Sequence, residues 1–217
     1  MKFADKSYTF FVLSVVASLS ILLFLFIWLN LESLSSQNFE HQVSNLVQSF
    51  RNDKLTSYMK FVTHVGDLYG YIAIILTLGI ILLLKRRFDL IIQIVSVVVS
   101  SALLNLFLKS LINRPRPYGE ALVKVNFHSF PSGHAMSAIV FYGLIIYLIF
   151  KLTKNVSIKL FSSIFCISLI LLIGLSRIYL GVHYPTDVLA GYSFGFTYLV
   201  VTIFIIKYFE FRNTNKT

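Results

Sequence analysis

The hydrophobic pattern of this chain consists of long apolar runs joined by short polar segments. Six of these runs approach or exceed the length that a helix needs to cross the hydrocarbon core of a bilayer, about 20 residues. They cover residues 8–31, 68–84, 90–108, 135–150, 156–175 and 188–206. The pattern therefore predicts an all-α, polytopic membrane protein with six transmembrane helices, so that both termini lie on the same side.

The segment between the first and second runs has a different pattern. Apolar residues recur there at helical spacing, with polar residues between them: Phe39, Val43, Leu46, Val47 and Phe50. This periodicity predicts an amphipathic helix that lies on the membrane surface. The helix either guides a lipid toward a site or connects two spans while shielding its own apolar face, and the sequence leaves both roles open.

Composition and charge agree with a membrane protein. Of the 217 residues, 57% are hydrophobic and 13% are charged, which is far from the composition of a soluble domain. The first run is too long for a secretory signal and no small-residue cleavage pattern follows it, so we expect it to be retained. We therefore expect one membrane-embedded domain over residues 1–217, located in the cell membrane.

The net charge of +10 by itself would also suit a nucleic-acid-binding protein. However, the lysines and arginines follow the predicted membrane topology. If the N-terminus is inside, eleven of them lie on the inner side and eight on the outer side, and four of those eight belong to the loops of a candidate site. This bias predicts that the N- and C-termini are cytoplasmic, and it leaves no reason to expect a nucleic-acid partner.

A first polar cluster ends the third run. Lys109 lies at the end of the predicted helix, and Arg114 and Arg116 follow it. Pro115 and Pro117 disfavour helix for the residues before them, so the chain leaves the helix in an extended path. Taken alone, such a cluster is more often an anchor at the membrane edge than a binding site.

A second polar cluster opens the fourth run. Ser132 is suited to cap a helix, and Gly133 would let a ligand approach the free backbone N–H groups of the first turn. A helix N-terminus of this kind binds phosphate well. An ordinary helix start has the same residues, and His134 is what makes the segment a candidate site.

A third polar cluster separates the fifth and sixth runs and contains Arg177, His183 and Asp187. If a helix begins near Pro185, which suits a first turn, Asp187 lies one turn from His183. Its carboxylate would then accept a hydrogen bond from the imidazole and leave the other ring nitrogen free to attack or to accept a proton. A short interhelical loop with polar residues facing water is an equally simple explanation of this stretch alone.

Six alternating spans place all three clusters on the same side of the membrane. Together they offer cations, backbone donors and two histidines, which suits transfer of a phosphoryl group. The carboxylate of Asp187 is engaged with His183, and no other cluster of carboxylates is available there to bind Mg²⁺. The sequence therefore predicts a reaction that uses no metal and no other cofactor.

These residues resemble the three-part signature of the type 2 phosphatidic acid phosphatase superfamily, the membrane lipid phosphate phosphatases. The three parts are Lys109-x6-Arg116-Pro117, Pro131-Ser132-Gly133-His134 and Ser176-Arg177-x5-His183-x3-Asp187. The signature covers residues 109–187, and the six-span layout extends the similarity over nearly the whole chain. Short bacterial members that act on phosphatidylglycerophosphate, phosphatidate or undecaprenyl pyrophosphate are similar in size and pattern.

The resemblance implies a role for each motif residue. His183 would be the nucleophile that forms a phosphohistidine, Asp187 would orient it, and His134 would protonate the leaving group and later activate water. The phosphate would be bound by Lys109, Arg116, Ser132, Gly133 and Arg177. The implied protein is a lipid phosphatase with a lipid phosphate and the bilayer as its partners, and the charge bias places its active site at the outer face.

Two other interpretations compete with this one. Vanadate-dependent haloperoxidases share this set of residues but resemble soluble proteins, whereas the helices here are predicted membrane spans. A non-catalytic protein that binds or transports a lipid headgroup would also need cations. Two histidines, one of them with a carboxylate partner, exceed what binding alone requires and favour the enzyme.

Overall fold

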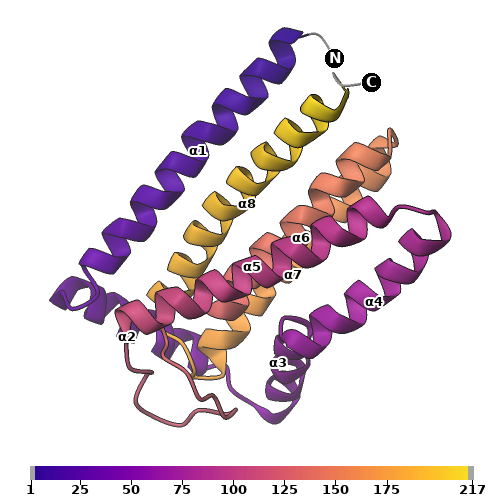
Figure 1. Ribbon diagram of the computed structural model, residues 1–217. Coiled ribbons are helices and arrows are strands. Elements are labelled where there is room, and N and C mark those ends of the chain that lie inside the picture. Colours follow the sequence, from indigo (N-terminus) through magenta and orange to yellow (C-terminus); the bar gives the residue numbers. More distant parts are fainter. Residues whose placement is uncertain (1–2, 215–217) are drawn as a thin grey trace.

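The computed structural model describes residues 3–214, without the side chains of residues 3–7, 9, 213 and 214. Lys2, Lys6 and Lys216, whose charges enter the topology prediction, lie outside the described side chains. The described part contains helices and no strand (Figure 1). The helices are α1 (Phe3–Leu29), α2 (Leu34–Gln48), α3 (Asp53–Val65), α4 (Leu68–Leu84), α5 (Phe88–Ile112), α6 (Gly133–Leu152), α7 (Val156–Tyr179) and α8 (Pro185–Thr214).

Five helices, α1, α5, α6, α7 and α8, are each long and apolar enough to cross a membrane. With 17 residues, α4 extends over about 25 Å, less than the hydrocarbon core of about 30 Å. It follows α3 after a bend of 56°, and the two together are long and apolar enough for a sixth, broken span. The prediction of an all-helical, multi-pass membrane protein is confirmed, whereas α3 is an element that the hydrophobic pattern does not predict.

The outer faces of the helices are apolar. Phe11 on α1, Leu76 on α4, Leu103 on α5 and Phe161 on α7 each expose more than half of their surface. In water such faces would be costly, but in a bilayer they contact lipid chains at no cost. The distribution is therefore that of a bundle surrounded by lipid.

The bundle is organised around α6, which packs against α5, α7 and α8, while α1 lies along α8 (Figure 1). Gly191 and Gly195 allow α8 to approach α6 closely. A Cβ atom on Gly191 would lie 2.6 Å from the carbonyl oxygen of Ser132, and one on Gly195 would lie 3.0 Å from that of Met136. This packing places the first turn of α6 against α8, and both helix starts carry candidate site residues.

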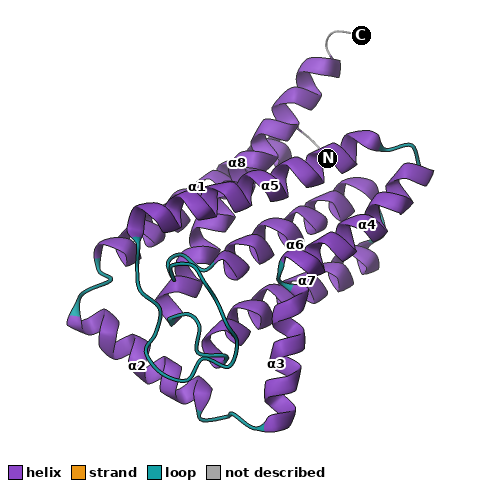
Figure 2. Cartoon of the chain, turned by 60° about the horizontal axis from the view of Figure 1, so that its bottom comes forward, coloured by secondary structure: helices purple, strands orange, loops and turns teal. Residues whose placement is uncertain are grey.

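All the polar clusters lie at one end of the bundle. The loop between α5 and α6, the loop between α7 and α8, and the helices α2 and α3 gather there (Figure 2). The beginning of α1 and the end of α8 lie at the opposite end (Figure 1). The loops that carry the three clusters therefore emerge on the same side, as the alternation of spans predicts.

The predicted helix after the first span is present as α2. Ser33 caps it by accepting a hydrogen bond from the backbone N–H of Ser36 at 3.2 Å. Phe39 and Leu46 remain exposed, whereas Glu40 is only 3% exposed. Because α2 packs against α7 and α8 at the end of the bundle that carries the polar clusters, it contributes this buried carboxylate to the neighbourhood of the candidate site.

Candidate active site

The structure brings the three polar clusters together. An Nη1 atom of Arg116 lies 3.4 Å from Nε2 of His183, which joins the first cluster to the third. The backbone N–H of Ser132 donates to the carbonyl oxygen of Asp187 at 2.9 Å, which joins the second cluster to the third. His134, in the first turn of α6, lies within electrostatic range of residues of the first cluster and of the third cluster. Residues more than 60 positions apart therefore form one site.

His183 and Asp187 form the hydrogen bond that their spacing predicts. The helix α8 begins at Pro185, and Nδ1 of His183 lies 3.2 Å from Oδ2 of Asp187. Both side chains are buried, and the backbone N–H of Tyr184 donates to the same carboxylate oxygen at 2.9 Å. Because a carboxylate only accepts, Nδ1 carries the hydrogen of the neutral ring and Nε2 keeps its lone pair.

His183 lies in surroundings that keep its ring neutral. Burial lowers the pKa of His183 well below its ordinary value, and the positive charges of the surrounding lysine and arginines lower it further. An uncharged imidazole with a lone pair on Nε2 is a nucleophile or a base at neutral pH. That nitrogen is the one that faces Arg116.

Three cations of the site have no carboxylate partner among the described side chains: Lys109, Arg116 and Arg177. Arg116 is held by backbone carbonyl groups instead, since it donates to those of Phe127 and Val182 at 2.6 Å. Lys109 is buried and donates to the carbonyl oxygens of His128 and Ser129. Buried cations are costly unless a negative charge compensates them, so this arrangement is suited to bind an anion.

Arg177 adds a second indication of an anion site. Its Nη1 donates to the hydroxyl of Thr63 on α3 at 2.6 Å, and its side chain is almost fully buried. Its Nε is also buried but has no hydrogen-bond partner among the described residues. Because buried N–H groups are nearly always paired, this donor marks a position where a ligand oxygen can bind.

The start of α6 contributes backbone donors. Ser132 caps the helix by accepting from the N–H of Ala135 at 3.5 Å. A Cβ atom on Gly133 would lie 2.9 Å from Oδ1 of Asn105, so a larger residue there would have to displace the Asn105 side chain of α5. The first N–H groups of a helix have no partner within the helix and are suited to bind an anion.

An apolar cavity of about 440 Å³ reaches the site from the side of α4 and α5. Gly133, His134 and Ser137 of α6 are part of its lining, and Asp67 is its charged lining residue. The rest of its wall is mostly apolar: Leu68, Tyr71, Ile72, Ile75, Leu76, Val95, Val98, Val99 and Ala102. Since α4 and α5 belong to the membrane-spanning bundle, the cavity is suited to hold a hydrocarbon chain next to His134.

Two site residues are missed by the sequence analysis, which gives Arg114 no role and does not consider Glu40. Arg114 donates to Asp187 at 2.6 Å and to both oxygens of Glu40 at 2.7 and 2.8 Å. The available signal was that Glu40 lies three and seven residues before Val43 and Val47, on the apolar face of α2. A carboxylate on that face is a candidate for a buried ion pair.

The described side chains contain no group of three histidines, cysteines or carboxylates that could hold a metal ion. A neutral imidazole lies beside three cations and a helix N-terminus, with a second histidine near it. This arrangement can bind a tetrahedral oxyanion and attack its central atom.

Comparison with known proteins gives consistent matches. The family model for the PAP2 superfamily matches residues 90–211. Phosphatidylglycerophosphatase B of Bacillus subtilis (strain 168) is 33% identical over 177 residues, which are 80% of this chain and 84% of that protein.

Two crystal structures are also similar. That of a transmembrane PAP2 type phosphatidylglycerolphosphate phosphatase from Bacillus subtilis has a TM-score of 0.83 at 30% identity, covering 88% of this chain and 96% of that one. That of Aquifex aeolicus LpxE has a TM-score of 0.61 at 23% identity, covering 75% of this chain and 93% of that one. The second similarity supports the fold alone.

Proposed function

The chain belongs to the PAP2 superfamily of membrane lipid phosphatases, and from this premise we propose that it hydrolyses a lipid phosphate through a phosphohistidine intermediate. The observation that carries the proposal is the position of His183. Its Nδ1 is bound to Asp187, and its Nε2 lies beside Arg116, where a bound phosphate would be. The nitrogen that has a lone pair is thus the one that would face phosphorus.

The proposed reaction has two steps. In the first, Nε2 of His183 attacks phosphorus, the bond from phosphorus to the ester oxygen breaks, and His134 gives its proton to the leaving oxygen. In the second, His134 takes a proton from water, whose oxygen attacks phosphorus and releases inorganic phosphate from His183. Cations and backbone N–H groups hold the phosphoryl oxygens throughout: Lys109, Arg116, Ser132, Gly133 and Arg177.

Support for a lipid substrate comes from the cavity between α4 and α5. Its apolar wall reaches His134, so that a hydrocarbon chain can lie within the bundle while the phosphate is among the cations. The Bacillus relative is a phosphatidylglycerophosphatase, which favours phosphatidylglycerophosphate as the substrate. Phosphatidate and undecaprenyl pyrophosphate present the same phosphate to the site and are the next candidates.

The proposed orientation places both termini in the cytoplasm and the active site at the outer face of the membrane. Lys85, Arg86 and Arg87 support it, since they connect α4 to α5 at the end of the bundle opposite the site. Positively charged loops favour the cytoplasmic side. A tag at the C-terminus should accordingly be protected from protease in intact cells.

The function is tested by phosphate release from the purified protein in detergent. The panel consists of phosphatidylglycerophosphate, phosphatidate, undecaprenyl pyrophosphate, diacylglycerol pyrophosphate and a water-soluble ester. We expect turnover of at least one lipid phosphate, no turnover by His183→Ala, and little effect of EDTA. His128→Ala is the matched control, because His128 is exposed and contributes only its backbone carbonyl oxygen to the site.

Two outcomes would contradict the proposal. Near wild-type turnover by a folded His183→Ala variant would exclude His183 as the nucleophile. Binding of lipid phosphates by the wild type without any release of phosphate would instead favour a headgroup-binding or transport protein.

A further inference from the structure

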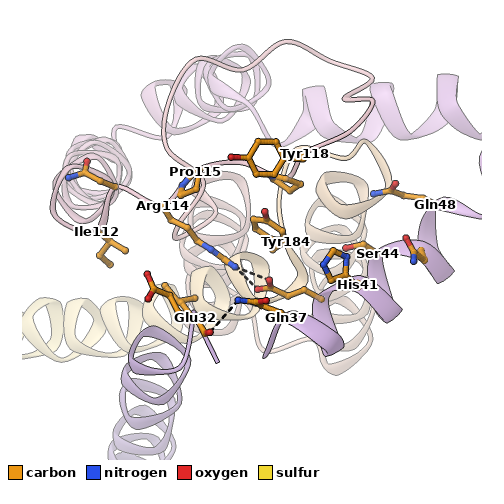
Figure 3. A pocket seen from close by; sticks show the side chains of 15 residues that line it. Glu32, Gln37, His41, Ser44, Gln48, Ile112, Arg114, Pro115, Tyr118 and Tyr184 are labelled. Atoms are coloured by element: carbon orange, nitrogen blue, oxygen red, sulfur yellow. Dashed lines mark hydrogen bonds and ion pairs between the residues drawn. The ribbon is translucent and has the colours of Figure 1, made fainter. Parts of the chain in front are cut away.

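A buried charged network contacts Nδ1 of His183, whereas the other ring nitrogen, Nε2, faces Arg116. Glu40 of α2 and Asp187 of α8 are both almost fully buried, and Arg114 lies between them. The network adjoins a separate cavity of about 490 Å³ between α2 and the segment that follows α5. Arg114 and Tyr184 line this cavity, as the close view shows (Figure 3).

The guanidinium of Arg114 is fixed from several directions. One nitrogen donates to Oδ1 of Asp187 at 2.6 Å and to the hydroxyl of Thr186 at 3.0 Å, and the other binds both oxygens of Glu40. Its Cζ atom also lies over the ring of Tyr184, 4.1 Å from the centroid. The hydroxyl of Thr186 in turn donates to Glu40. With these partners, Arg114 has little freedom to take another position.

The two oxygens of Asp187 consequently have different partners. Arg114 occupies Oδ1, while Oδ2 accepts from Nδ1 of His183 and from the backbone N–H of Tyr184. The orientation of the carboxylate therefore depends on Arg114, whose own position depends on Glu40. A release of Arg114 from Glu40 would let its guanidinium move toward Oδ2 and compete with His183.

The charges of the network match the proposed reaction. Glu40, Arg114 and Asp187 carry one more negative than positive charge. Burial lowers the pKa of Arg114, but Asp187 and Glu40 raise it above its ordinary value, so the guanidinium remains charged. When Nε2 of His183 bonds to phosphorus while Nδ1 keeps its hydrogen, the ring becomes positive. The excess negative charge of the network then compensates it.

We propose that Glu40 is a positioning residue for His183 and acts through Arg114 and Asp187. This inference rests on the proposed function and assigns a role to α2 that the periodicity of its sequence does not reveal. The helix supplies a carboxylate to the network that orients the nucleophile. Its packing against α7 and α8 is then needed for turnover.

The test compares Glu40→Gln with Glu32→Gln in purified protein. Glutamine keeps the size of Glu40 but removes its charge, and Glu32 is an exposed carboxylate that lines the same cavity (Figure 3). We expect Glu40→Gln to lower kcat by about 10- to 100-fold, as for other residues that orient a catalytic group, and to leave KM unchanged. Glu32→Gln should behave as the wild type.

Inhibition by vanadate and by inorganic phosphate separates positioning from general damage. Vanadate would form its bond to His183, whereas product phosphate is held by the cations alone. We therefore expect Glu40→Gln to weaken inhibition by vanadate and to leave inhibition by phosphate unchanged. An equal weakening of both would show a disrupted site and overturn the inference.

A second variant guards against a folding defect. Glu40→Asp keeps the negative charge but shortens the side chain, so it should retain part of the turnover that Glu40→Gln loses. A wild-type kcat in Glu40→Gln would overturn the role of Glu40. A kcat of Glu40→Asp that is no higher than that of Glu40→Gln would overturn it as well. If the wild type itself releases no phosphate in this assay, the proposed function fails and the inference fails with it.

Discussion

Replacing Asp187 by asparagine tests the hydrogen bonds that set the tautomer of His183. The carboxylate of Asp187 is fully buried and accepts from three donors. Arg114 binds Oδ1 at 2.6 Å, while His183 and the backbone N–H of Tyr184 bind Oδ2 at 3.2 and 2.9 Å. An asparagine has a single acceptor oxygen in place of two. Either Arg114, or His183 together with the backbone N–H of Tyr184, must therefore face the NH₂ group.

The strength of the bonds decides the orientation of the amide. A hydrogen bond to a charged donor is roughly twice as strong as a neutral one, so the oxygen of the asparagine should face Arg114. Its NH₂ group then faces His183 and Tyr184. To accept from this group, Nδ1 of His183 must give up its hydrogen, and the ring proton moves to Nε2. The nitrogen beside Arg116 then has no lone pair with which to attack phosphorus.

The expected magnitude follows from this change of tautomer. The same substitution in the Ser-His-Asp triad, which also leaves the geometry intact and fixes the wrong tautomer, lowers kcat by about 10⁴-fold. We expect Asp187→Asn to lower kcat by about 10³- to 10⁴-fold, or roughly 4–5.5 kcal/mol in activation free energy. The backbone N–H of Tyr184 loses its acceptor as well, which should cost about 1–3 kcal/mol of stability.

The assay is phosphate release in detergent, with thermal unfolding measured on the same samples. Asp89→Asn is the matched control, because Asp89 pairs with Arg87 on the exposed surface at the other end of α5. It should keep wild-type kcat. A folded Asp187→Asn variant that retains a kcat within about tenfold of the wild type would refute the tautomer argument.

Two further predictions concern the histidines. Because the pKa of His183 lies well below the ordinary histidine value of 6.5, the ring becomes protonated only at a pH well below 6.5. The fall of kcat/KM at acidic pH that is caused by protonation of the enzyme should therefore also lie below pH 6.5. A fall centred above pH 6.5 in a pH titration would contradict a neutral nucleophile. His134→Gln should lower kcat by about 10²- to 10⁴-fold for a lipid phosphate and much less for p-nitrophenyl phosphate, whose leaving group needs no proton. Equal losses with both substrates would exclude His134 as the general acid.

Much of the candidate site could be predicted from sequence because topology and local geometry determine it. An even number of spans separates the cluster at Lys109 from that at His183, so both must emerge on the same side. A proline in the first turn of α8 places Asp187 within reach of His183. Chain alternation and helix geometry alone determine these two features, and neither feature depends on how side chains pack.

The parts that could not be predicted depend on contacts between distant segments. Arg114 and Arg116 flank Pro115 and look equivalent in the sequence. In the structure, Arg114 binds Glu40 and Asp187, whereas Arg116 faces Nε2 of His183. The local pattern of α2 does not reveal that Arg114, 74 residues away, compensates the buried charge of Glu40. The bend between α3 and α4 similarly becomes visible only in three dimensions.

Ion pairing divides the cations of the site into two kinds. Arg114 is neutralised by two carboxylates and is therefore unsuited to attract a phosphate, although it lies two residues from Arg116. Three cations of the site have no such partner among the described residues. Arg116 faces Nε2 of His183, and Lys109 and Arg177 act on the ring through their positive charges. Since a phosphate monoester carries about −1.5 to −2 charges near pH 7, their charge suits its binding. The ring of His183 thus lies between a cationic side that favours the phosphate and an anionic side that favours the positive ring of the intermediate. This polarity would be lost if the two arginines exchanged their partners.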